Sequence, residues 1–171
     1  MAQDALVTYL NDHLGGSAAA LQLLEHLVDR ESGESKAFFA GLLEDVSADR
    51  DTLEDIIHRI GDPSAVRAMG GWLLEKASRV KLMWDDPSGN ALKELEALEL
   101  LQIGIHGKAS LWRALRRVSP RIAALRDVDF RRLEQRADEQ HARVEARRLA
   151  SAERVLTAGR TADSRARVRV H

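Results

Sequence analysis

Apolar residues recur at helical spacing in five segments of the chain, and turn-forming residues separate these segments. The segments cover about residues 4–30, 34–60, 63–84, 91–118 and 129–158. Glycine and proline, which favour helix ends, lie between them at Gly33, Gly61, Pro87 and Pro120. The pattern therefore predicts four long helices, with a shorter helix between the second and the third.

The composition favours helices over strands. Hydrophobic residues make up 44% of the 171 residues but aromatic residues only 4%, and the aliphatic, alanine-rich remainder suits helix packing. The absence of cysteine excludes disulfides, thiolate zinc sites and a cysteine nucleophile. We expect one all-α domain over residues 1–158, followed by a disordered basic tail over 159–171, with Gly159 closing the last helix.

The first residues lack the basic and apolar regions of a secretory signal, and no stretch reaches the roughly 18 apolar residues of a membrane span. These two features predict a cytoplasmic protein with no membrane partner.

Charge is unevenly distributed, although the net charge is only -1. Residues 1–109 carry 10 basic and 19 acidic side chains, whereas residues 110–171 carry 16 and 8. Acidic helices packed beside a basic one would produce this asymmetry, and so would a nucleic-acid partner. We favour charge complementarity within one bundle and do not expect nucleic-acid binding.

Each long helix places polar residues near the middle of its apolar stripe. These residues are His13, Ser17, Asp49, Gln102, His141 and Arg148. Four-helix proteins that bind two metals hold them at this level of the core. The layer therefore predicts either a metal site or a buried hydrogen-bond network.

One motif in the last helix, Asp138-Glu139-Gln140-His141, combines with the helix order to give a family resemblance. The chain resembles the ferritin-like superfamily over about residues 4–158, and residues 103–112 look like a segment of uncharacterised bacterial ferritin-like proteins. The resemblance implies a four-helix bundle whose shorter helix crosses over between the second and third long helices. In metal-binding members it also implies a Glu from each of two helices and a Glu-x-x-His pair from each of the other two.

The chain departs from that ligand pattern. Gln102 stands where a Glu is needed, Thr52 follows Asp49 where a His is needed, and Arg148 adds a cation. We therefore favour a degraded metal site, replaced by a network that fixes helix register.

In this network we expect Asp49 to accept hydrogen bonds from Arg148 or His141, with Ser17 and Gln102 completing the layer. The neighbouring Lys108 is expected to extend its amine to the bundle edge. Gly104 and Gly107 would let another helix approach closely.

The function expected from these residues is a non-enzymatic helical bundle that acts through protein contacts or self-association. It would need a protein partner or a second copy and no cofactor. The alternative is a divergent metal-binding protein with redox activity, using Asp49, His141 and His13 to hold iron or manganese. No phosphate-binding loop or serine-nucleophile elbow occurs, so a non-enzymatic role is favoured while the question of enzyme activity stays open.

Overall fold

The computed structural model describes residues 2–61 and 91–168, with side chains described for 4–61 and 92–157. The α-helices are α1 (Ala2–Arg30), α2 (Gly33–Ile60), α4 (Ala91–Val118) and α5 (Phe130–Val168). Two short 3-10 turns, η1 (Ser119–Arg121) and η2 (Ala123–Leu125), join α4 to α5. This part of the chain contains no strand, which confirms the all-α class. The helix predicted over 63–84 lies outside the described residues.

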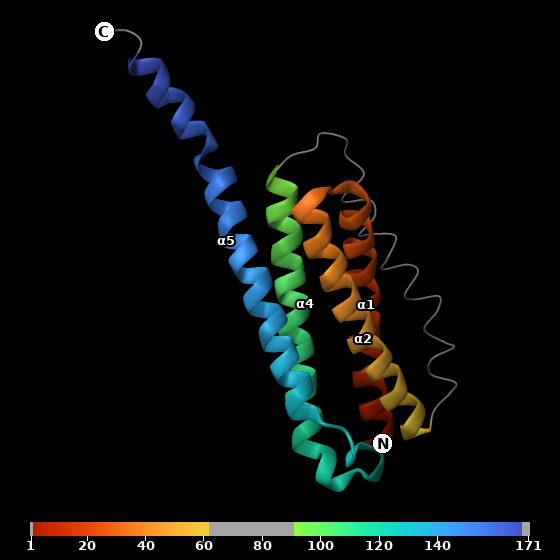
Figure 1. Cartoon of the computed structure of the whole chain (residues 1–171). Helices are drawn as coiled ribbons and strands as arrows, with labels where there is room; N and C mark the ends of the chain where they lie inside the picture. Colours follow the sequence, from red (N-terminus) through yellow and green to blue (C-terminus); the bar gives the residue numbers. More distant parts are fainter. Residues whose placement is uncertain (1, 62–90, 169–171) are drawn as a thin grey trace.

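The helices form two antiparallel hairpins (Figure 1). In the first hairpin α1 packs on α2, in the second α4 packs on α5, and α1 also contacts α4. Because α2 and α4 run in the same direction, the end of α2 and the start of α4 lie at opposite ends of the bundle (Figure 1). No helix of the described chain has an apolar stretch that could span a bilayer.

Local sequence accounts for the helix ends. Gly61 has the left-handed backbone (φ 92°) that closes α2, and its N–H donates to the carbonyl oxygen of His58 at 3.2 Å. At the start of α5, the Asp129 carboxylate accepts a hydrogen bond from the N–H of Arg132 at 3.1 Å, as expected of an N-cap.

The last helix differs from the expectation at its C-terminal end. α5 continues through Gly159 to Val168, so the helix end predicted at Gly159 is wrong. A glycine inside a helix costs only about 1 kcal/mol, and the alanine and arginine residues that follow are good helix formers. The division into a domain over 1–158 and a disordered basic tail over 159–171 stays a prediction.

The apolar core has two parts. One contains Leu10, Leu14, Ile56, Trp112 and Phe130, and the other contains Leu24, Phe39, Leu42, Leu98 and Val144. On α2 the boundary between them falls at Asp49, which lies between Val46 of the second part and Leu53 of the first. Of the predicted polar layer, Asp49 thus lies where the two apolar clusters meet.

Candidate functional site

A buried carboxylate joins three helices. Asp49 of α2 is 2% exposed, and its Oδ2 accepts a hydrogen bond from Gln140 Nε2 of α5 at 3.0 Å. Lys108 of α4 forms an ion pair with the same oxygen, and Arg136 of α5 forms one with Oδ1. Lys108 also donates to Gln140 Oε1. We call Asp49, Lys108, Arg136 and Gln140 the buried cluster.

Two cations face one carboxylate in this cluster. Burial lowers the pKa of the Lys108 ammonium below its usual range, while the Asp49 carboxylate opposes that effect. Asp45, one turn before Asp49, pairs with Arg143, so that outer pair adds no net charge. The cluster therefore carries one positive charge in excess when Lys108 is protonated.

The prediction that Asp49 lies in the interior is confirmed, but the prediction that Arg148 or His141 binds it is wrong. Arg148 instead donates to Glu145 at 2.7 Å and lies 3.7 Å from Glu99. Gln102 donates to the same Glu145 carboxylate. These groups form a second polar cluster between α4 and α5, outside the core.

The predictions for Ser17 and Lys108 are also wrong. The Ser17 hydroxyl donates to the carbonyl oxygen of Leu14 at 2.6 Å and accepts a hydrogen bond from Arg50 at 3.1 Å. Lys108 turns inward to Asp49 and does not extend to the bundle edge. An unpaired Asp49 would be costly in the interior, and this cost is the physical reason for the inward direction.

The two histidines of the metal alternative are half-buried on different helices. His13 of α1 packs edge-on against the Tyr9 ring with centroids 4.8 Å apart, and burial lowers its pKa. Arg148 and, to a smaller extent, His141 of α5 lower the pKa of the Glu145 carboxyl. The Asp49 carboxylate is bound by Lys108, Arg136 and Gln140.

Among the described residues, no three histidine, aspartate or glutamate side chains are grouped so that they could hold a metal ion. A metal at Asp49 would also have to displace two cations from its oxygens. The site of Asp49, His141 and His13 therefore gains no support from the geometry, and it stays a prediction.

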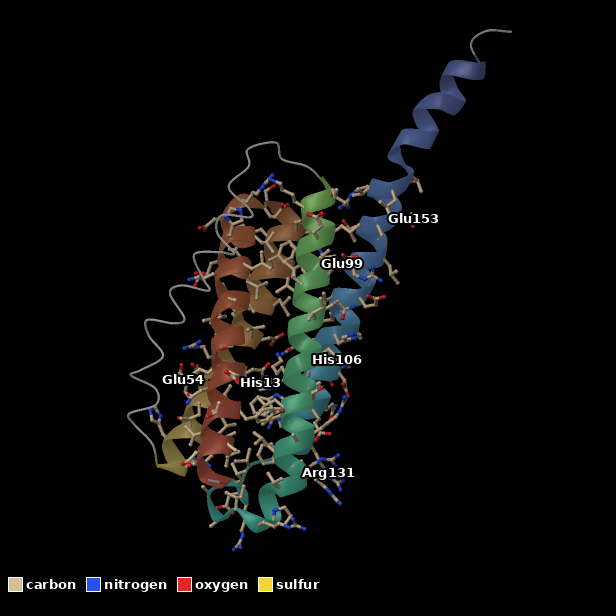
Figure 2. All side chains as sticks on the ribbon, turned by 180° about the vertical axis from the view of Figure 1, so that it is seen from behind. His13, Glu54, Glu99, His106, Arg131 and Glu153 are labelled. Carbon is tan, nitrogen blue, oxygen red and sulfur yellow. The ribbon has the colours of Figure 1, made fainter. Side chains whose placement is uncertain are left out.

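A cavity of about 190 Å³ lies beside the buried cluster, between α1, α2 and α4. Its walls are mostly apolar and include Val46, Leu53, Leu101, Ile105 and Leu111. Polar or charged groups reach it from Asp12, His13, Ser17, Asp49, Arg50 and Lys108. His13 is labelled in Figure 2, on the α1 side of this cavity.

Three glycines line the cavity, Gly16 and Gly104 at exposed positions and Gly107 at a half-buried one. A Cβ atom added at Gly16, Gly104 or Gly107 would meet no other atom within 4 Å. The prediction that Gly104 and Gly107 admit a closely packed helix is therefore wrong within the described chain. Trp112 also lines the cavity, and its buried Nε1 has no hydrogen-bond partner among the residues that the structure describes.

Basic residues of α5 pair with acidic residues of the other hairpin and of α4. Arg143 pairs with Asp45, and Arg147 lies 2.7 Å from Glu94. These contacts confirm charge complementarity inside the bundle as one cause of the uneven charge along the chain.

The fold defines the class of this protein as an all-α helical bundle with a buried ionic cluster. No family model, no curated protein and no solved structure matches the chain.

Proposed function

We propose that this protein is a non-enzymatic bundle of the ferritin-like kind that acts through protein contacts, and that its first partner is a second copy of itself. Two antiparallel hairpins in which α2 and α4 run in the same direction are consistent with ferritin-like connectivity. The contact surface in this proposal is the outer side of α4 and α5.

Exposed apolar side chains on that side carry the proposal. Within the described residues, five of the six exposed large hydrophobic side chains belong to α4 or α5. They are Leu92, Leu100, Ile103, Leu149 and Leu156, which we call the outer face. Ile103 is 69% exposed and Leu156 66%. Apolar side chains gathered on one side of a bundle favour contact with another protein surface.

Helical spacing places four of these residues on one side of the hairpin. Leu92, Glu99 and Ile103 are seven and four residues apart on α4, and Glu145, Leu149 and Leu156 are four and seven apart on α5. The outer polar cluster joins the two stripes, because Arg148 approaches Glu99 and Gln102 donates to Glu145. Figure 2 labels Glu99 on the α4 stripe.

The charges of the outer face suit a symmetric dimer. A two-fold interface brings the same patch of both copies together, so the patch must complement itself. Glu99 and Glu145 lie beside Arg148. A copy related by two-fold symmetry could therefore place its Arg148 beside Glu99 while the leucines and Ile103 leave water.

The buried cluster supports a non-enzymatic role. Asp49 and Lys108 are the titratable pair of the buried cluster that lines the cavity, and they form an ion pair with each other. Each also has a further hydrogen-bond partner in the cluster, so neither Asp49 oxygen is free to act as a base.

Sedimentation velocity of the full chain from low to high micromolar concentration tests the proposal. We expect a concentration-dependent dimer, which Ile103→Glu or Leu149→Glu converts to a monomer because a carboxylate would have to be buried. Tyr9→Glu is the matched control and should leave the dimer intact, since Tyr9 is an exposed large hydrophobic side chain of α1, outside the outer face. A wild-type monomer at every concentration, or glutamate variants that still dimerise, would contradict the proposal.

A further inference from the structure

We infer that the cavity between α1, α2 and α4 binds a small organic carboxylate with an apolar body, and that Lys108 and Trp112 hold its carboxylate. This site is separate from the outer face and does not depend on self-association.

Within the described part of the chain, both residues offer a proton that has no acceptor. A lysine ammonium has three donors, and Lys108 uses two of them on Asp49 Oδ2 and Gln140 Oε1. Trp112 is 1% exposed, and its Nε1–H, which can only donate, is buried without a partner among residues 4–61 and 92–157. Lys108 and Trp112 are four residues apart on α4, so they face the cavity one turn apart.

The unmet groups are donors, so the missing partner is an acceptor. Leaving a buried donor unpaired has the full desolvation cost of that group, which a ligand oxygen would remove. Asp12 lines the cavity at an exposed position, whereas in the interior Asp49 is shared by Lys108 and Arg136, so the charge balance beside Lys108 favours an anion. Arg50, also at the cavity, is already paired with Glu54 at 2.8 Å. A carboxylate supplies two acceptor oxygens and the missing negative charge.

The walls determine the rest of the ligand. Val46, Leu53, Leu101 and Ile105 line the cavity, and the absent side chains of Gly16, Gly104 and Gly107 leave it open. An engineered apolar cavity of about 150 Å³ holds one benzene molecule. A volume of about 190 Å³ therefore fits a single-ring or short branched-chain acid.

Titration of the full chain with benzoate tests this site, by calorimetry and by the Trp112 indole N–H resonance. Benzamide has the same shape without the charge and is the matched ligand. We expect benzoate to bind one per chain, to shift the Trp112 resonance, and to bind at least about tenfold more tightly than benzamide.

Variants assign the contacts. Lys108→Met and Trp112→Phe should each weaken benzoate binding by about tenfold, since each removes one donor while retaining most of the side-chain volume. Lys36→Met, at an exposed position of α2, is the matched control and should bind benzoate as the wild type does. Gly104 lines the cavity at an exposed position, so Gly104→Leu adds a side chain at its mouth and should weaken binding without unfolding the bundle.

Several results would overturn the inference. One is a lack of benzoate binding, which is expected if water fills the cavity. Another is equal affinity for benzoate and benzamide. The third is unchanged benzoate binding by a folded Gly104→Leu variant. The dimer of the outer face should be unaffected by these cavity variants, so failure of this site and failure of the proposed self-association give different results.

Discussion

Removing the Asp49 carboxylate should destabilise the bundle far more than removing a surface carboxylate. Asp49→Ala would leave Lys108, Arg136 and Gln140 without their shared acceptor in the interior. Breaking a buried pair costs about 3–5 kcal/mol. Because the Arg136 side chain is 31% exposed and can partly regain water, we expect the low end, about 3 kcal/mol. For a chain of this size that corresponds to a Tm about 6–12 °C lower.

Chemical denaturation followed by far-ultraviolet circular dichroism measures this loss. Asp45→Ala is the matched control, since Asp45 is one turn away and pairs with Arg143, whose side chain is 51% exposed. An exposed pair contributes less than about 1 kcal/mol, so Asp45→Ala should be nearly neutral. The double variant Asp49→Leu/Lys108→Met removes both buried charges of one pair and should be more stable than Asp49→Ala. If Asp49→Ala loses less than about 1 kcal/mol, the reasoning about the buried cluster is wrong.

Three further predictions follow from single residues. Gly104→Ala should raise the free energy of unfolding by about 1 kcal/mol, because its Cβ meets open space and alanine favours the helix; a loss of stability in denaturant would contradict the open cavity. Burial lowers the pKa of His13 below 6.5, so the unfolded chain binds this proton more readily, and stability should fall as the pH decreases from 6.5 toward the folded-state pKa. His13→Gln should reduce this loss of stability at low pH, and identical pH profiles of stability for the variant and the wild type would contradict the role of His13. The hydrogen bond from Arg148 lowers the pKa of Glu145 to about 2, so an NMR titration should find Glu145 ionised well below pH 4.5; Arg148→Gln should raise that pKa, and a wild-type value near 4.5 would show that the pair does not form in solution.

The helices and their apolar faces could be predicted from the sequence because they depend on local spacing. The segments expected at 34–60 and 91–118 agree with α2 and α4, and Asp49 was expected inside from its place between Val46 and Leu53. Each of these expectations depends only on the helical period of about 3.6 residues, which determines the face on which a side chain lies.

The partners of Asp49 could not be predicted in the same way. Lys108 and Arg136 have long, flexible side chains, so the direction of their Cβ atoms does not determine where the charges lie. Their inward direction depends on the spacing of α2, α4 and α5, which helical periodicity does not contain. The one available signal was the need of a buried carboxylate for a cation, and it did not distinguish Lys108 and Arg136 from Arg148.

The cavity was missed for a related reason. Glycines on a helix face are compatible with close packing and with open space, and only the placement of α1 relative to α4 distinguishes the two. That the buried Nε1 of Trp112 lacks an acceptor among the described residues depends on the positions of its neighbours in space, which helical periodicity does not give.

Self-association through the outer face can be tested most directly by the distance between two copies of the same labelled position. The chain has no cysteine, so Ser110→Cys on α4 and Ala48→Cys on α2 each provide a single nitroxide site at an exposed residue. Ser110 is seven residues from Ile103 and so lies on the same side of α4. Pulsed electron paramagnetic resonance at high protein concentration should give a shorter distance between copies from position 110 than from position 48. No dipolar coupling between copies, or a shorter distance from position 48, would contradict the proposed function.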